Sequence, residues 1–336
     1  MKLAGKTDVG RVRQENQDDY RAGELPGGAV WALVCDGMGG AKGGREASQG
    51  ACNVIEQVFQ EQYAQCGAGQ EGAFLKKALI SANRYVFNKA AHEESLAGMG
   101  TTAVCALVRG GEATLCHAGD SRAYLCRGGK LTQLTHDHSY VQELVDCGTI
   151  TEEEAEHHPQ KNIITKALGV DYRLEPEVTS VQLQAKDLLL LCSDGLTNMV
   201  PVEQMEQLLA QGPFYDLPDR LVDAANENGG SDNITALLLA VAAAVVVLLA
   251  VGQALEEVTG FLTELGERTG VSPELFVPLY KAVGIALVVR VGSSLCRDAG
   301  ESALASVVET AGAVCALVVS LPLLRTVLSL LLELME

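Results

Sequence analysis

The feature that most constrains this chain of 336 residues is an abrupt change of composition near residue 240. The run Ile234–Gly252 reads ITALLLAVAAAVVVLLAVG, and no charged residue falls between Asp232 and Glu256. The run is close to the roughly 20 residues that span a bilayer. It predicts membrane association, because Val245–Ala250 would be apolar on every side of a helix. We therefore expect one domain in residues 1–240 and a hydrophobic helical segment in residues 241–336.

Residues 1–240 mix short apolar runs, Gly-rich turns and amphipathic stretches. Six apolar runs read as strands: Ala29–Cys35, Thr102–Val108, Ala113–His117, Ala123–Cys126, Leu188–Cys192 and Ile234–Leu239. Apolar residues recur at helical spacing in Arg45–Gln62 and Ala73–Ala91. Strands in clusters, with the helices grouped separately, indicate an α+β fold with mixed sheets and helices on the outside.

Charge and cysteine usage exclude several classes of protein. Asp and Glu number 43 against 25 Lys and Arg, and no basic run occurs, so we expect no binding to nucleic acid. The N-terminal stretch MKLAGKTDVGRVRQENQDD lacks the apolar segment of a secretory signal. The ten cysteines include no C-x-x-C pair, which argues against a zinc ribbon or a disulfide framework and fits the reducing cytoplasm.

Aspartates recur beside the predicted strands. Asp36, Asp120 and Asp194 each follow an apolar run, Asp232 comes just before the final strand, and Asp18 precedes the first. One such aspartate is most often a turn former. Several of them, each flanked by Gly, Ser or Asn, predict carboxylates gathered at one rim of a sheet.

Carboxylates packed together repel one another unless protons or cations separate them. Oxygen ligands favour magnesium or manganese, and two such ions sharing a carboxylate can activate a water and clamp a phosphoryl group. Bound ions would also let an acidic protein accept an anionic phosphate. Arg13 fits this picture, since a planar guanidinium can hold two phosphate oxygens, although a surface arginine is the simpler interpretation of Arg13 alone.

The motifs GRVRQENQDD, VCDGMGG, GMGTTAV, AGDSRAYL, SDGLTNMV and SDNIT follow one another within residues 1–240. In this order they resemble the metal-dependent serine/threonine protein phosphatases of type 2C (PPM), and in particular the bacterial subgroup that opposes Ser/Thr kinases. The resemblance implies a four-layer sandwich of two antiparallel sheets flanked by helices. It also implies phosphorylated proteins as substrates and two Mn²⁺ or Mg²⁺ ions as cofactors, with a third ion as an option.

The resemblance assigns metal-binding roles to particular residues. Asp36 would bridge the two ions, Asp194 and Asp232 would complete the first, and the Gly37 carbonyl would help to hold the second. Asp18 would lie just outside the direct ligands. A hydroxide between the ions would attack phosphorus in line, without a phosphoenzyme.

The same resemblance assigns the surroundings of the ions. Asp120, together with Asp194, would hold the third ion, Arg13 would hold the phosphate, and Asn233 would steady nearby polar groups. The segment Thr135–Gly169 would be a mobile flap that influences the choice of substrate.

This sequence departs from the family pattern at two positions. Met38 stands where many eukaryotic members have histidine, which leaves the acid for the leaving group open. Gln17 stands where some members have Glu, so the surroundings of the ions carry less charge.

Other motifs allow different interpretations. CHAGDSR, from Cys116 to Arg122, fits the C-x-x-G-x-x-R pattern of cysteine-dependent phosphatases, although Asp120 would then repel the phosphate. GGAKGGREAS lacks the G-K-[ST] of a nucleotide-binding P-loop. His136 and His138 form H-x-H, for which a solvated loop is favoured over metal ligation.

The C-terminal third resembles a different family, the stage III sporulation protein AD membrane proteins. The resemblance rests on AVGIALVVRVGSSLCRDAGESALASVVETAGAVCALVVSLPLLRTVLSLLLEL. It implies a component of a channel-like sporulation complex, with sporulation proteins as partners. The alternative function is therefore a membrane assembly component that carries the phosphatase domain as an accessory.

The junction leaves two explanations open. A genuine fusion would tether a cytoplasmic phosphatase domain to a membrane through residues 241–336. Alternatively, two neighbouring reading frames are joined, and the phosphatase is a cytoplasmic protein. The final strand and a first spanning helix would both require Ile234–Leu239.

Overall fold

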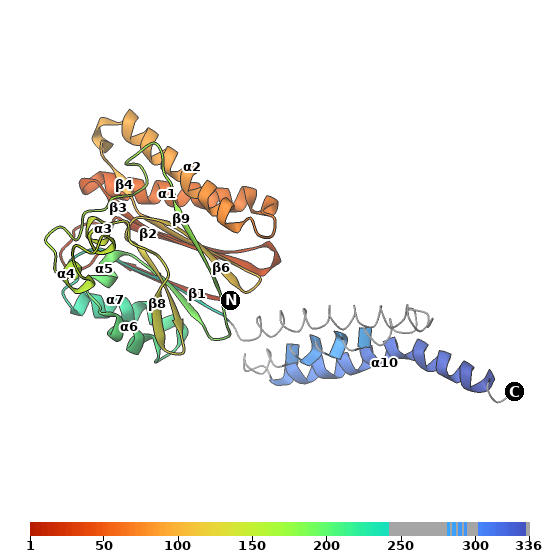
Figure 1. The fold of residues 1–336 in the computed structure, drawn as a ribbon. Helices are drawn as coiled ribbons and strands as arrows, with labels where there is room; N and C mark the ends of the chain where they lie inside the picture. Colours follow the sequence, from red (N-terminus) through yellow and green to blue (C-terminus); the bar gives the residue numbers. More distant parts are fainter. Residues whose placement is uncertain (242–280, 283, 287, 291, 294–301, 334–336) are drawn as a thin grey trace. The chain divides into compact units, whose positions relative to one another are not determined.

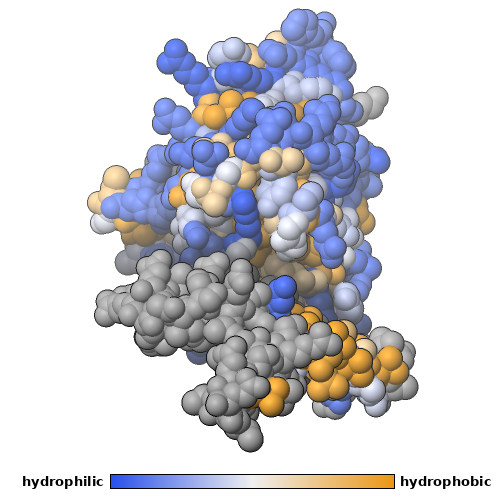
Figure 2. All heavy atoms as spheres, turned by 90° about the vertical axis from the view of Figure 1, so that its right-hand side faces the viewer, coloured by the Kyte–Doolittle hydropathy of each residue, from blue (hydrophilic) through white to orange (hydrophobic). Residues whose placement is uncertain are grey.

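The computed structural model describes residues 1–241, 281, 282, 284–286, 288–290, 292, 293 and 302–333. The chain divides into two compact units, Met1–Ala242 and Ala243–Glu336. On the face shown in Figure 2, hydrophilic side chains cover most of the first unit, in keeping with its many acidic residues.

The first unit contains two antiparallel sheets, and the strand order of the first sheet is β1-β11-β10-β7-β8. Its strands are β1 (Lys2–Asp8), β7 (Arg122–Arg127), β8 (Lys130–Gln133), β10 (Leu188–Cys192) and β11 (Ile234–Ala240). Strands β1 and β11 pair along their whole length although they come from opposite ends of the unit. This pairing brings the loop after β1 beside the loop before β11, where Asp232 lies.

The strand order of the second sheet is β2-β3-β5-β6-β9, and β4 pairs with β3. Its strands are β2 (Asp18–Leu25), β3 (Ala29–Met38), β4 (Gly100–Thr101), β5 (Ala103–Arg109), β6 (Glu112–Ala118) and β9 (Glu177–Gln182). A 3-10 turn at Pro26–Gly28 joins β2 to β3 as a hairpin.

Helices cover the outer face of each sheet (Figure 1). The pair α1 (Gly40–Gln62) and α2 (Glu71–His92) packs on the second sheet, and the pair α6 (Val202–Leu209) and α7 (Leu217–Glu227) packs on the first. The sandwich of two antiparallel sheets flanked by helices, which the family resemblance implies, is therefore confirmed for the first unit. The mixed sheets expected from the strand pattern are wrong, because every strand pairing in the first unit is antiparallel.

Strand residues alternate between two buried layers. On β3, Trp31 faces the helices and stacks on Phe59 of α1, with ring centroids 4.5 Å apart. Val30, Ala32 and Val34 point to the other face of the strand and are also buried. Because both faces are covered, β3 appears in the sequence as a continuous apolar run instead of an alternating pattern.

The remaining helices of the first unit are short. The predicted flap, residues 135–169, contains α3 (Tyr140–Asp146) and α4 (Glu152–Glu156), and α5 (Asp194–Thr197) begins two residues after β10 ends. Further 3-10 turns lie at Tyr63–Gln65, Glu94–Leu96 and Phe214–Asp216.

Sequence patterns predict the six buried strands β3, β5, β6, β7, β10 and β11 to within a few residues, together with α1 and α2. They do not predict β1 and β2, whose sequences KLAGKTD and DDYRAGEL contain charged residues and glycine. Most residues of these two strands are only partly buried, so they lack a strong apolar signal.

The apolar run at the junction begins as a strand. Ile234–Ala240 forms β11, so these residues belong to the final strand and not to a helix. The rest of the predicted spanning run, residues 242–252, lies outside the described residues. In the second unit, α10 (Ser302–Glu333) is described, with exposed apolar side chains that include Val314, Leu317 and Val318. Among the described residues, no helix combines the length and the apolar character needed to cross a membrane.

Candidate metal centre

Two of the predicted ligands face each other across the β2–β3 hairpin. Asp18 is the first residue of β2 and pairs in register with Asp36 of β3. Asp36 lies inside β3, which continues to Met38, so the prediction that this aspartate follows its strand is wrong. Like charges directly opposite on neighbouring strands are destabilising, so this pair requires a proton or a cation.

Two further aspartates come from loops at the ends of neighbouring strands. Asp194 is the first residue of α5, two residues after the end of β10, and Asp232 lies two residues before β11. Gly195 allows these segments to approach, because a Cβ there would lie 1.9 Å from the carbonyl oxygen of Asn233. Any larger residue at Gly195 would push the Asp194 segment away from Asp232.

Asp120 lies in the turn between β6 and β7 and is buried. Its Oδ1 atom is buried without a hydrogen-bond partner, as is Oδ1 of Asp18. Buried carboxylate oxygens without partners are costly unless something else compensates for them.

Burial and neighbouring negative charge raise the pKa of Asp18, Asp36, Asp120 and Asp194. Burial and the neighbouring Asp18, Asp194, Asp120 and Asp232 together raise the pKa of Asp36 well above its usual value. Burial, followed by the charges of Asp194 and Asp232, raises the pKa of Asp18 to about 7 in spite of two hydroxyl hydrogen bonds. Burial and the charge of Asp194 raise the pKa of Asp120 to about 8. The predicted gathering of the five aspartates in one place is therefore present in the structure.

This donor set fits a hard divalent cation. All the side-chain donors are carboxylate oxygens, two of these oxygens are buried without partners, and the mutual repulsion is relieved by positive charge. Gly37 follows Asp36 directly, and a Cβ on it would lie 2.1 Å from the carbonyl oxygen of Gly44. Glycine is therefore required for the close backbone approach at this end of β3.

Hydroxyl side chains that the sequence analysis did not single out hold the backbone of Asp36. The amide of Asp36 donates to Thr102 Oγ1 at 3.0 Å, and Thr101 Oγ1 donates to the carbonyl oxygen of Asp36 at 2.8 Å. Thr102 Oγ1 also lies 2.7 Å from Ser121 Oγ, next to Asp120. The sequence feature that could have indicated these hydroxyl side chains is their position inside the motifs GMGTTAV and AGDSRAYL.

Arg13 and Asn233 lie beside Asp232. The Nη2 atom of Arg13 donates to Oδ2 of Asp232 at 2.7 Å. The side chain of Asn233 donates to the carbonyl oxygens of Val9 and Glu15, both at 3.0 Å, and accepts the amide of Gln17 at 2.8 Å. Asn233 thus fixes both sides of the loop that carries Arg13.

Comparison with known proteins identifies this arrangement. Residues 10–239 match the sequence model of the family Protein phosphatase 2C. This chain belongs to the Protein phosphatase 2C family. The predicted resemblance is confirmed, and with it the enzyme class, a protein serine/threonine phosphatase.

The match to individual relatives covers nearly their whole length. Serine/threonine phosphatase stp of Listeria welshimeri is 40% identical over 235 residues, which are 70% of this chain and 93% of that protein. Protein phosphatase PhpP of Streptococcus pneumoniae is 36% identical over 240 residues, which are 71% of this chain and 97% of that protein.

Solved structures of Protein phosphatase 2C relatives share the fold. Serine/threonine phosphatase Stp1 from Staphylococcus aureus has a TM-score of 0.68 at 36% identity, with 71% of this chain and 94% of that chain covered. The catalytic domain of serine threonine protein phosphatase PstP was solved in complex with two manganese ions. It has a TM-score of 0.62 at 35% identity, with 70% of this chain and 96% of that chain covered.

The C-terminal part matches a second family. Residues 279–334 match the sequence model of the Stage III sporulation protein AC/AD protein family, which confirms the resemblance seen in the sequence.

The cysteine-dependent alternative is wrong. Cys116 is fully buried in the core of the second sheet, and burial raises the pKa of its thiol to about 12. A nucleophilic cysteine needs an accessible thiolate. Cys116 is therefore a core residue of the Protein phosphatase 2C fold.

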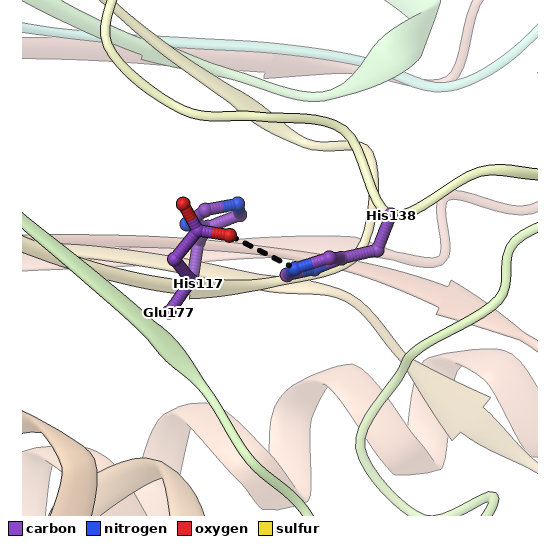
Figure 3. Close-up of side chains that lie close together, drawn as sticks. All are labelled: His117, His138 and Glu177. Carbon is purple, nitrogen blue, oxygen red and sulfur yellow. Dashed lines mark ion pairs between the residues drawn. The ribbon is translucent and has the colours of Figure 1, made fainter. Parts of the chain in front are cut away.

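His117, His138 and Glu177 form a second polar cluster, between β6, the start of the flap and β9 (Figure 3). Their potential ligand atoms all lie within 4.8 Å of one another. His136 is exposed and pairs with Asp146, but His138 is buried, so the prediction of a solvated loop is wrong for His138.

The geometry of this cluster does not suit a metal ion. The His117 and His138 rings stack with centroids 4.7 Å apart and an interplanar angle of 11°, so one ion cannot lie in the plane of both rings. His138 Nδ1 accepts the amide of Gly119 at 3.2 Å, which assigns the proton of the neutral ring to Nε2. This Nε2 lies 3.4 Å from a carboxylate oxygen of Glu177. The cluster instead joins the base of the flap to the turn that carries Asp120.

A cleft of about 1050 Å³ begins at Asp120 and Asp194 and extends between the flap and the start of α6. Val141 and Val145 of α3, Lys161 after α4, and Met199 and Val202 near α6 are among its lining residues. A chain lying in this cleft would contact both the aspartate cluster and the flap.

Proposed function

We propose that this chain hydrolyses phosphoserine and phosphothreonine in proteins, at a centre of two Mn²⁺ or Mg²⁺ ions. The observation that carries the proposal is the convergence of carboxylates. Asp18 and Asp36 are register partners, Gly195 brings the Asp194 segment against the Asp232 segment, and Asp120 and Asp194 line one cleft. Membership of the Protein phosphatase 2C family supports the same reaction. Proteins phosphorylated by a Ser/Thr kinase are the proposed substrates.

Within this proposal the ions have defined ligands. Asp36 would contact both ions, Asp194 and Asp232 would complete the first, and the Gly37 carbonyl would contribute to the second. Asp18 would lie just outside the direct ligands. Asp120, together with Asp194, would hold a third ion, and the orphaned Oδ1 atom of Asp120 supports this assignment.

The ions would supply an activated water and neutralise the charge on the phosphoryl group. The protein's own side chains bind and orient the substrate. Arg13 would leave its contact with Asp232 and donate to two phosphate oxygens. Asn233 would keep the Arg13 loop in place through its three backbone hydrogen bonds. Residues on either side of the phosphorylated one would lie in the cleft beside the flap.

The test is phosphate release from phosphoserine and phosphothreonine peptides by the full chain. The chain is first treated with a chelator and is then supplied with Mn²⁺, Mg²⁺ or Ca²⁺. We expect no release after chelation and recovery with Mn²⁺ or Mg²⁺. Undiminished release by the chelated chain would overturn the metal-dependent reaction.

The C-terminal part supports a separate proposal. We propose that residues 1–240 form the phosphatase domain and that residues 241–336 form a second domain that attaches it to a membrane and to sporulation proteins. The match of residues 279–334 to the Stage III sporulation protein AC/AD family supports this division, as do the two compact units. The phosphatase domain would then lie on the cytoplasmic side.

Fractionation of the source cells tests the tether. An antibody against residues 1–240 should detect one band near the full mass of 35.5 kDa in the membrane fraction. A shorter band in the soluble fraction would show instead that two reading frames were joined. The phosphatase proposal would stand in either case.

A further inference from the structure

Hydroxyl groups surround one oxygen of Asp18. Asp18 is only 7% exposed, and its Oδ2 atom accepts hydrogen bonds from Ser193 Oγ at 2.6 Å and from Thr235 Oγ1 at 2.7 Å. Both distances are at the short end of the range for a hydroxyl that donates to an oxygen. Oδ1, the other oxygen, is buried and has no partner. The two oxygens of this carboxylate are therefore in different environments.

The two hydroxyls belong to a longer chain of hydrogen bonds. Thr235 Oγ1 lies 2.8 Å from Thr7 Oγ1, and Asn16 Nδ2 donates to Thr7 Oγ1 at 2.8 Å. The amide of Asp18 donates to Asn16 Oδ1 at 3.1 Å, which closes the circuit. Ser193 Oγ accepts the amide of Thr235 at 3.0 Å.

The direction of these hydrogen bonds follows from the groups at the two ends. Asn16 Nδ2 can only donate, and Asp18 Oδ2 accepts from both the Ser193 and the Thr235 hydroxyls. The Thr7 hydroxyl therefore donates to Thr235, and the Thr235 hydroxyl donates to Asp18. Because each hydroxyl has one hydrogen, reversing any of these links would remove the Thr235 donor and leave Asp18 Oδ2 with the Ser193 hydroxyl alone.

The circuit joins segments that carry other candidate ligands. Thr7 of β1 and Thr235 of β11 are register partners in the first sheet, whereas Asp18 belongs to the second sheet. Ser193 immediately precedes Asp194, and Thr235 lies three residues after Asp232. The position of Asp18 is thus fixed relative to two segments that carry candidate ligands.

We propose that Ser193, Thr235 and Thr7 are positioning residues for the metal centre, holding Asp18 Oδ2 so that only Oδ1 faces the ions. The inference rests on the proposed function, and it adds residues that contact neither phosphate nor ion. Fixing a carboxylate before the ion arrives removes part of the ordering cost of binding. Loss of such supporting hydrogen bonds typically weakens metal affinity 10–100-fold.

The experiment measures binding of Mn²⁺ alone to the metal-free full chain by calorimetry. Thr235→Val removes the hydroxyl but keeps the shape of the side chain and the amide that donates to Ser193. We expect Mn²⁺ to bind this variant about 10–100-fold more weakly. Thr235→Ser keeps a hydroxyl and should bind Mn²⁺ within about threefold of the unmodified chain.

A matched control separates positioning from general stability. Thr114 of β6 is also buried and hydrogen-bonded, to Ser180 at 3.3 Å, but it takes no part in the circuit. Thr114→Val should lower the unfolding temperature without changing Mn²⁺ affinity. Unchanged Mn²⁺ affinity in a folded Thr235→Val variant would overturn the proposal.

Two further variants keep the test decisive. If Thr235→Val does not fold, Thr7→Val removes the preceding link and should weaken Mn²⁺ binding in the same direction but by less. In an Asp18→Asn background, Thr235→Val should have no further effect on affinity, because the hydroxyl acts through the carboxylate. An unmodified chain that binds no Mn²⁺ would contradict the proposed function itself. Normal binding by every variant would contradict only the positioning role.

Discussion

The guanidinium of Arg13 lies 2.7 Å from a carboxylate oxygen of Asp232. The side chain proposed to bind phosphate therefore contacts a side chain proposed to bind a metal ion. Both side chains are partly exposed, at 54% for Arg13 and 35% for Asp232. The two groups come from loops 219 residues apart in the sequence. Cation binding at Asp232 and phosphate binding at Arg13 would each weaken this contact, so the two events are linked.

Arg13→Ala should therefore affect the two ligands differently. Loss of a charge-assisted contact to phosphate should raise the KM for a phosphopeptide about 10–100-fold. Affinity for Mn²⁺ should stay equal or rise slightly, because a positive charge beside Asp232 is removed. Kinetics and calorimetry on the same preparation measure both. Arg11→Ala is the control, since Arg11 is an exposed arginine of the same loop. A parallel loss of Mn²⁺ affinity would show that Arg13 is instead needed to hold the site together.

Asp36→Ala should abolish metal-dependent phosphate release. Loss of several kcal/mol of charge stabilisation corresponds to a rate about 10³-fold lower. Cys116→Ser should retain most of the activity, since the Cys116 thiol is buried and its raised pKa keeps it protonated. Assays with a phosphothreonine peptide compare the two variants. The reverse pattern would contradict the metal mechanism.

Metal-free protein should lose stability as the pH rises. The folded pKa values of Asp18 and Asp120, about 7 and about 8, lie above the ordinary value of 3.8. The native state therefore binds more protons than the unfolded state between about pH 4 and pH 8, and its free energy of unfolding falls across that window. Mn²⁺ can replace the protons, so it should raise the unfolding temperature more at pH 8 than at pH 6.

Thermal unfolding of the full chain, with and without Mn²⁺ at the two pH values, measures this effect. Asp120→Asn removes one of the titrating groups. In this variant the rise in unfolding temperature caused by Mn²⁺ should differ less between pH 6 and pH 8. Equal stabilisation by Mn²⁺ at pH 6 and pH 8 would count against a cluster that is protonated when metal-free.

The buried His138 should have the opposite effect on stability, which it should lower as the pH falls. Burial, with smaller effects from His117 and Lys166, lowers its pKa to about 4, although Glu177 acts in the opposite direction. Between pH 6.5 and about pH 4 the unfolded state binds a proton that the native state does not. Stability is therefore lost as the pH falls through this window.

His138→Asn tests this prediction. An Asn side chain can still accept the Gly119 amide but does not titrate, so the loss of stability below pH 6.5 should become shallower than in the unmodified chain. His92→Asn, at the exposed end of α2, is the control. Identical pH profiles for His138→Asn and the unmodified chain would show that His138 does not titrate as its burial predicts.

The sequence by itself determined the buried strands and which carboxylates are candidate ligands. Strands such as β3 and β10 are apolar on both faces, and local composition is enough to predict them. Asp36, Asp120, Asp194 and Asp232 lie in short motifs in or beside buried apolar strands, whereas Asp18 begins the polar strand β2. These motifs in order indicated the family. Edge strands such as β1, by contrast, carry polar residues whose conformation depends on the partner strand.

Only the tertiary structure decided how the site is assembled. The register of β2 and β3 places Asp18 opposite Asp36, and the pairing of β1 with β11 brings Thr7 to Thr235. These contacts join residues that are far apart in the sequence, so no local pattern specifies them. In the structure Ile234–Ala240 is a strand, because pairing with β1 and β10 satisfies the hydrogen bonds of its backbone inside the sheet.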